Sequence, residues 1–162
     1  MKTLDYLHLN EEETVEVIQG LGQLLADYQI FYTNLRGYHW NIKGEKFFEL
    51  HLKFEELYND VAIKIDELAE RILMLGGLPE NRYSEYLKQA HLKEVSHVSC
   101  GNKALKDILY SYGYLIGLER QVLSHASKAG DESTVATMSD YIKNQEKLVW
   151  MLVAYQANTC DK

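Results

Sequence analysis

The chain has 162 residues, of which 46% are hydrophobic and 25% are charged, and its formal net charge is -7 at neutral pH. This length is enough for one domain with a buried core and too short for two ordinary domains, so we expect a single domain over residues 1–162. The longest uncharged run within a helical pattern, residues 108–118, is far shorter than the roughly 20 residues that a bilayer crossing needs, which excludes a membrane-spanning protein. The first residues show no basic segment followed by an apolar stretch, so we expect no secretory signal and a cytoplasmic protein.

The first predicted helix covers residues 10–40. Asn10 is a suitable N-cap, with Glu13 three residues later. His39 lies on the apolar line of this helix and therefore needs a partner. The line recurs in alternating steps of three and four residues, at Ile18, Leu21, Leu25, Tyr28, Tyr32, Leu35 and His39.

The second predicted helix covers residues 47–75, after a break at residues 41–46. It ends at Gly76 and Gly77, and Pro79 beyond them reinforces the stop. This helix carries four side chains of metal-binding type, His51, Glu55, Asp66 and Glu70.

The rest of the chain contributes two more long helices. Residues 80–101 are irregular apart from a short predicted helix at 83–90, and they are long enough to cross a bundle. The third helix is predicted at 102–129 and the fourth from 131 to about 158. Four helices with one long middle connection predict an all-α protein, a ferritin-like four-helix bundle with a short extra helix between helices two and three.

Glu119 interrupts the apolar line of the third helix. Arg120 beside it favours a position at the edge of that line, so we leave Glu119 out of the predicted site. An interior metal site of the ferritin type needs a Glu from each of two helices and a Glu-x-x-His from each of the others, and this chain lacks that set. Its only such motif, Glu94 with His97, falls in the irregular connection.

The two histidines and three acids above are types that bind iron, but one chain is not expected to gather them all. Asp66 lies about 22 Å beyond His51 along a helix, too far for one metal. Glu55, Asp66 and Glu70 nevertheless project within about 60° of one another. An antiparallel copy of the helix would close two equivalent sites per dimer. A lone helical histidine is more often a packed residue, and helical acids usually form a solvated face; the repeated i, i+4 pairing favours the site.

The segment TNLRGYHWNIKGEKFFELHLKFEELYNDVAIKIDELAERI, residues 33–72, resembles the signature of the Dps family, bacterial mini-ferritins that protect cells during starvation and oxidative stress. The family pattern is a His-Trp pair, a second His twelve residues after the first, an acid four later, and then an Asp and a Glu. Glu55 stands where the family often has Asp, which lengthens the carboxylate arm.

The resemblance implies a homododecameric shell with ferroxidase sites at its two-fold dimer interfaces. Each site would take two Fe ions, bound by His39, His51, Glu55, Asp66 and Glu70. Fe(II) would be oxidised by hydrogen peroxide, the oxidant usually favoured in the family, or by dioxygen, and stored as ferric mineral. No organic cofactor is implied.

The resemblance also implies further roles, each with a plain structural alternative. Trp40 would lie close to the oxidising centre, or only pack at a helix end. Glu56 would help to nucleate mineral, or be a solvated surface residue. Asp131, Glu132 and Asp140 would line acidic pores that admit Fe(II), or simply favour the start of the fourth helix through its dipole.

Many members of this family bind DNA through a lysine-rich N-terminal arm, which makes DNA protection the alternative function. The first thirteen residues here hold one cation, Lys2, against four acids, and the whole chain is acidic. We therefore expect no tight DNA binding. A metal-free interaction module would explain the helices but not the five ligands. Cys100 and Cys160 form no motif and receive no role, and the twelve tyrosines receive none either.

Overall fold

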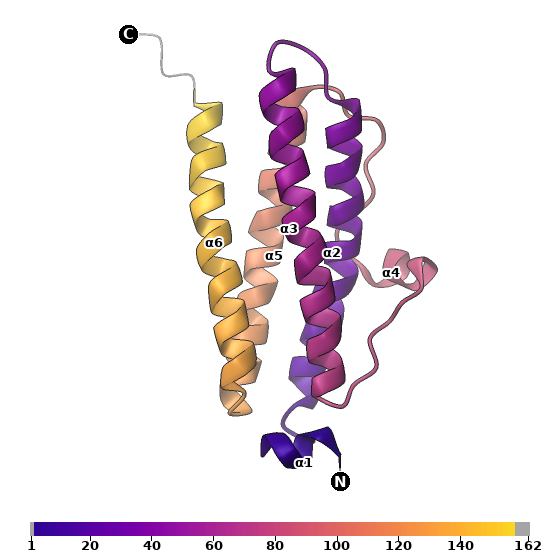
Figure 1. The fold of residues 1–162 in the computed structure, drawn as a ribbon, viewed down its shortest axis with the longest axis vertical. Helices are drawn as coiled ribbons and strands as arrows, with labels where there is room; N and C mark the ends of the chain where they lie inside the picture. Colours follow the sequence, from indigo (N-terminus) through magenta and orange to yellow (C-terminus); the bar gives the residue numbers. More distant parts are fainter. Residues whose placement is uncertain (1, 158–162) are drawn as a thin grey trace.

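The computed structural model describes residues 2–157, and these are helical with no strand beyond one isolated bridge between Lys43 and Cys100. The helices are α1 (Thr3–Leu7), α2 (Val15–Asn41), α3 (Phe47–Met74), α4 (Tyr83–Gln89), α5 (Gly101–Lys128) and α6 (Glu132–Gln156). Figure 1 shows four long helices side by side, with α4 outside α2 and α1 across one end of the bundle. Within residues 2–157, no helix combines the length and the apolar character of a bilayer-crossing segment.

The order of the long helices is the ferritin-like one. α2 and α3 form an antiparallel hairpin, and the connection after α3 returns to the end of the bundle where α3 began, so α5 runs parallel to α3 (Figure 1). α6 then runs antiparallel to α5. α2 is the central helix, because it packs on α3, α5 and α4. This arrangement confirms the predicted all-α bundle and its extra helix.

Two glycines set the ends of α3 and α5. Gly76 (φ +80°) and Gly130 (φ +67°) adopt the left-handed conformation that closes a helix. After α3, the N–H of Gly77 donates to the carbonyl of Ile72 at 2.9 Å, a bond that ends the helix as the Gly76-Gly77 pair predicts.

The connection between α3 and α5 is tied to α2 by two buried polar side chains. Asp27 accepts a hydrogen bond from the N–H of Leu92 at 2.7 Å. Asn34 donates to the carbonyl of Lys93 at 2.9 Å and accepts from the N–H of Val95 at 3.1 Å. These bonds satisfy backbone groups that no regular element pairs, so the connection has a fixed course.

The N-terminal region differs from the prediction in two ways. Residues 3–7 form α1, which is too short to show a hydrophobic period. The predicted start of the first long helix at Asn10 is wrong. The Asn10 side chain accepts from the N–H groups of Glu12 and Glu13, at 2.8 and 3.4 Å, and so caps a turn, while α2 begins at Val15.

Candidate metal centre

His39 and His51 face each other across the α2–α3 turn. His39 lies in the last turn of α2 and His51 in the second turn of α3, and both are partly buried. Their imidazole rings stack with centroids 3.8 Å apart and planes 19° apart. The helical hairpin thus brings together two histidines that are twelve residues apart in the sequence.

Two reciprocal hydrogen bonds fix these rings. Nδ1 of His39 lies 2.8 Å from the backbone oxygen of His51, and Nδ1 of His51 lies 2.9 Å from the backbone oxygen of His39. A carbonyl oxygen can only accept, so each Nδ1 carries the hydrogen and donates it. Each Nε2 then keeps its lone pair. This is the arrangement by which histidine ligands are oriented in metal sites.

Aromatic neighbours hold the stacked pair from both sides. Phe47 stacks on His51 with centroids 5.0 Å apart, and Tyr58 meets His39 edge-on at 5.4 Å. Neither residue belongs to the predicted site. A signal for Tyr58 was present, because it follows His51 by seven residues and therefore lies on the same side of α3.

The three predicted acids lie on α3 but are not gathered around the histidines. Glu55, one turn after His51, is partly buried, whereas Asp66 and Glu70 are exposed farther along the helix. Among residues 2–157, no group of three or more His, Cys, Asp or Glu side chains is placed to hold a metal ion. One chain therefore supplies the two histidines at one end of α3 and two of the acids near the other.

The same face of α3 carries large apolar side chains in solvent. Phe48 is 77% exposed, Leu52 65% and Ile63 61%. At 100° per residue they project within about 80° of Glu55, and Leu73 at the far end projects with them. Several exposed large apolar side chains beside acidic positions on one helix face are typical of a surface that another protein covers. We call Phe48, Leu52, Ile63 and Leu73 the α3 strip.

Trp40 and Glu56, predicted near the site, are both on the surface. The Trp40 side chain is 65% exposed, and the Arg36 guanidinium lies 4.7 Å from its ring centroid. Glu56 is paired with Lys53 at 2.6 Å and is open to solvent. Their positions fit the plain alternatives as well as the predicted roles.

The three predicted pore residues do not share one environment. Glu132 and Asp140 are exposed on α6. Asp131 is 1% exposed, accepts from the N–H of Thr134 at 2.9 Å and pairs with Arg71 at 2.5 Å. Asp131 therefore caps α6 and joins it to α3, and its carboxylate does not face an opening.

Glu119 is buried, so the predicted edge position is wrong. The side chain is inaccessible to solvent, its Oε1 accepts from the Tyr28 hydroxyl at 2.5 Å, and Gln145 donates to that oxygen at 2.7 Å. Burial raises the pKa of Glu119 to about 7, against the lowering effect of these two hydrogen bonds and of Lys64. We call Tyr28, Glu119 and Gln145 the interior network. A metal site in the bundle interior would need several acidic side chains, and the interior network contains one, Glu119.

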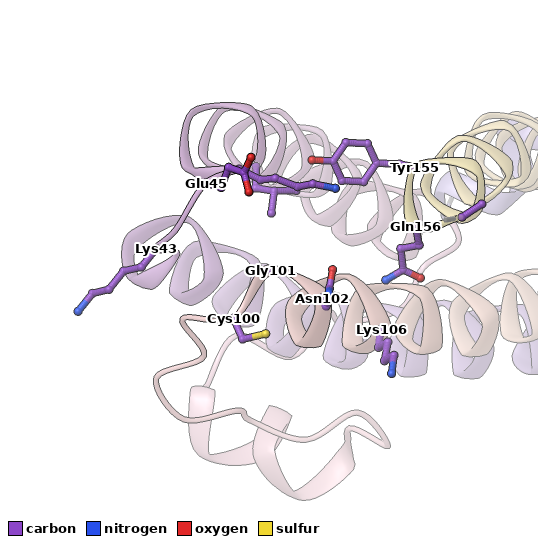
Figure 2. A pocket seen from close by; sticks show the side chains of 11 residues that line it. Lys43, Glu45, Cys100, Gly101, Asn102, Lys106, Tyr155 and Gln156 are labelled. Carbon is purple, nitrogen blue, oxygen red and sulfur yellow. The ribbon is translucent and has the colours of Figure 1, made fainter. Parts of the chain in front are cut away.

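A cavity of about 520 Å³ opens at the end of the bundle where α5 begins. Figure 2 shows Lys43 and Lys106 directed away from the space between the helices, so their charges do not converge on a ligand. Cys100 lines this cavity and is exposed, and Cys160 lies outside the described residues. The cavity is therefore not the candidate centre.

Comparison with known proteins shows the family to which this fold belongs. The ferritin-like domain family matches residues 18–160. A Porphyromonas gingivalis protein named DNA protection during starvation protein is 50% identical over 154 residues, 95% of this chain and 97% of that protein. The crystal structure of a Dps protein from Vibrio cholerae has a TM-score of 0.90 at 48% identity, covering 92% of this chain and 94% of that one. The chain belongs to the Dps family.

A more distant relative also matches this chain over most of its length. A Helicobacter pylori DNA protection during starvation protein is 35% identical over 144 residues, which is 88% of this chain and 100% of that protein. The Vibrio cholerae Dps is described as a member of a broad superfamily of ferritin-like diiron-carboxylate proteins. The Dps fold of this chain thus extends over nearly its full length.

Proposed function

We propose that this Dps protein is an iron-storing ferroxidase whose metal site is shared between two subunits. The observation that carries the proposal is the His39–His51 pair, in which both Nδ1 atoms donate to backbone carbonyls and both Nε2 atoms stay free. The ordering of two imidazoles before any metal arrives favours binding, because little conformational freedom is then lost.

A two-fold axis across the middle of α3 would complete the site. An antiparallel partner centred between Asp60 and Val61 places His51 opposite the partner's Glu70 and Glu55 opposite the partner's Asp66. The same centre places Phe48 of the α3 strip opposite the partner's Leu73. Because one register pairs ligands with ligands and apolar with apolar side chains, the α3 face supports an isologous dimer.

Imidazole and carboxylate ligands suit both Fe(II) and the harder Fe(III). His39 and His51 would bind through Nε2, and Glu55 with the partner's Asp66 and Glu70 would supply the negative charge that stabilises the ferric product. With hydrogen peroxide as oxidant, two Fe(II) ions each give up one electron, and peroxide with two protons becomes two water molecules. A paired two-electron step of this kind releases no hydroxyl radical.

We propose further that the protein assembles into a cytoplasmic dodecamer that stores the ferric product as mineral. Exposed Glu56 would offer carboxylate oxygen to the growing mineral. Glu132 and Asp140 would attract Fe(II) to openings between subunits, because negative potential in a narrow passage raises the local concentration of cations. Oxidation of iron inside a shell would protect the cell against peroxide.

Subunit mixing tests the shared site. One variant, H39A with H51A, lacks the histidines, and a second, D66N with E70Q, lacks two acids. Neither shell should oxidise Fe(II) rapidly with peroxide. Dissociated and reassembled together, each mixed dimer should regain one intact site, so that about a quarter of the wild-type sites return in a 1:1 mixture.

The control is the same pair of variants mixed without dissociation, which should stay inactive. Recovery after reassembly would support the shared site. Wild-type oxidation no faster than that of iron without protein would contradict the ferroxidase, and equal inactivity before and after reassembly would contradict the sharing of sites.

DNA protection is the second candidate, because relatives carry that name. The charge of -7 opposes direct contact with phosphates, and Lys2, in the N-terminal arm, pairs with Glu11 at 2.6 Å. We expect no retention of plasmid in a gel shift at neutral pH and physiological salt. Retention that falls as salt rises would contradict this, and retention abolished by EDTA would identify a metal bridge.

A further inference from the structure

We propose that Tyr28 is a redox-active tyrosine, which gives one electron to a strong oxidant formed during iron oxidation and passes its phenolic proton to Glu119. The site lies inside the bundle and uses residues that the metal centre does not. This proposal rests on the proposed ferroxidase for its oxidant and for the Fe(II) that restores Tyr28, but the tyrosine itself can be tested without iron.

The two atoms that would share the proton are already in contact. The Tyr28 hydroxyl donates to Glu119 Oε1 at 2.5 Å, and both side chains are inaccessible to solvent. Gln145 donates from Nε2 to the Tyr28 oxygen and to Glu119 Oε1, at 2.7 Å each. An oxidised phenol becomes a very strong acid, so a base already in hydrogen-bond contact can take the proton without water.

Burial makes Glu119 a good acceptor. Its second oxygen, Oε2, is buried without a hydrogen-bond partner. A carboxylate in that position has lost solvation and gains by taking up a proton, as the raised pKa of Glu119 also indicates. Electron loss followed by transfer of the proton leaves a neutral radical beside a neutral acid, so the apolar interior holds less charge than before.

Aromatic rings connect this pair to the metal centre. His39 lies 5.4 Å from Tyr58, and Tyr58 lies 6.0 Å from Tyr32, between ring centroids. Tyr28 follows one turn away from Tyr32 on the same side of α2, about 6 Å along the helix axis. Electron tunnelling weakens exponentially with distance, so several short steps are faster than one direct transfer from Tyr28 to the metal site.

The reaction balances with a hydroxyl radical as the oxidant. Should one Fe(II) react alone with hydrogen peroxide, the products are Fe(III), hydroxide and a hydroxyl radical. The radical gains one electron through the aromatic chain and becomes hydroxide, while Tyr28 becomes a neutral radical and Glu119 becomes protonated. One further Fe(II) then returns an electron to Tyr28, Glu119 returns the proton, and the iron leaves as Fe(III).

Other tyrosines also contact carboxylates but differ from Tyr28. Tyr155 donates to Glu49 at 2.8 Å in an exposed pair on the surface. Tyr114 donates to Asp27 at 3.0 Å, but that carboxylate already accepts from Leu92 and Gln23. Only Tyr28, among these three, combines a fully buried acceptor with a place at the end of the aromatic chain.

The first experiment oxidises the metal-free shell with azide radicals made by pulse radiolysis, and follows the tyrosyl radical by its optical absorption. Wild type should show a long-lived tyrosyl component. Y28F should lose that component, E119Q should shorten its lifetime, and Y155F should keep it unchanged. A long-lived component that persists in Y28F would overturn the proposal.

High-field EPR of the wild-type radical gives a measurement that needs no variant. A neutral tyrosyl radical that accepts hydrogen bonds, as Tyr28 would from Gln145 and protonated Glu119, has a lowered largest g-value. A radical without hydrogen bonds would overturn the assignment to Tyr28. Melting curves and shell size of Y28F and E119Q show whether each variant is folded.

The second experiment adds Fe(II) and peroxide and freezes samples for EPR. The same radical should appear in wild type and be lost in Y28F. One outcome overturns the link between Tyr28 and the metal centre: the tyrosyl radical forms with azide radicals but not with Fe(II) and peroxide, in a shell that does oxidise iron rapidly. A radical with azide in a shell that does not oxidise iron leaves the tyrosine site standing and places the failure in the proposed ferroxidase.

Discussion

The histidine pair at the α2–α3 turn and the interior network are both polar clusters, but they are built in opposite ways. The pair has its Nδ1 atoms satisfied within one chain, while its Nε2 atoms and the α3 strip beside it stay open. The interior network is closed to solvent and supplied by three helices of the same chain. The first is fit to bind something from outside, and the second is fit to move a proton between fixed partners.

This difference explains why we place the proposed metal site outside the bundle interior. A carboxylate-bridged metal pair in a bundle interior needs acids from several helices, whereas the interior network supplies Glu119 alone. The acids of α3 face outward instead. In the proposed ferroxidase, the face of α3 that carries the acids would therefore decide where the metal binds.

The strongest test of this comparison is to disrupt the α3 strip beside the histidine pair. I63D would place a charge without a partner in the proposed contact between subunits, at a cost of about 3–5 kcal/mol for each buried charge. We expect dimers and larger assemblies to dissociate, and rapid iron oxidation to disappear although both histidines remain. Light scattering coupled to size-exclusion chromatography measures the assembly.

Y110D is the matched control, because Tyr110 is 67% exposed on α5, away from the α3 strip. It should keep the wild-type size. An I63D shell of full size and full activity would show that α3 is not the shared surface.

The next test concerns the charge of Glu119 in the interior network. The pKa of Glu119 is about 7 in the folded protein against an ordinary 4.5, so the folded state holds this proton more tightly than the unfolded chain. The free energy of unfolding should therefore fall as the pH rises through the window between these two pKa values, by about 3 kcal/mol in all. E119Q should remove that slope and be more stable than wild type at pH values above the window.

Urea unfolding across the window, at one protein concentration, measures this effect. Below the lower end of the window, wild type and E119Q should differ little. Parallel pH profiles for the two proteins would show that Glu119 does not titrate as its burial requires.

A smaller effect is expected at the predicted pores. D140N removes one exposed negative charge per subunit and should slow the first phase of iron uptake a few-fold, on the order of the lower range for electrostatic steering. The difference should shrink with added salt, since the screening length falls from about 30 Å at 0.01 M to about 8 Å at 0.15 M. E94Q, which neutralises an exposed acid of the connection, is the control. Equal uptake rates in D140N and wild type would remove the pore role.

The smallest effect is optical. In a W150F background, Trp40 is the one remaining tryptophan, and its exposed ring at the end of α2 should lose fluorescence when Fe(II) binds without oxygen. The loss should saturate with filling of the sites and be absent when H39A and H51A are added. Titration under anaerobic conditions measures it, and quenching that survives removal of both histidines would separate Trp40 from the centre.

Much of the fold follows from the sequence, because long helices leave repeated signals. The alternation of three and four residues predicts the long helices at residues 10–40 and 102–129, and Gly76 predicts the end of α3 within two residues. α1 has only five residues and offers no period. The predicted start of α2 is wrong because Asn10 is as suitable for capping a turn as for capping a helix.

For the candidate site, the sequence predicts that His39 and His51 come together, but it does not predict their contacts. The spacing of His39 and His51 indicates a shared location, but the exchange of Nδ1 bonds depends on the geometry of the α2–α3 turn. Glu119 shows the opposite case. Its partner Tyr28 is 91 positions away in the sequence, so no local pattern reveals that a carboxylate on an apolar line is satisfied by a hydroxyl from another helix.

The reciprocal bonds between His39 and His51 have a consequence for assembly. These bonds already order the imidazoles, so iron binding would not have to arrange the histidines. Its binding energy would instead stabilise the contact of α3 with α3 of a second subunit. Metal capture and subunit pairing would then be thermodynamically linked, and each would strengthen the other by the same factor. Dilution that separates subunits would weaken their hold on iron, and iron would in turn hold the shell together.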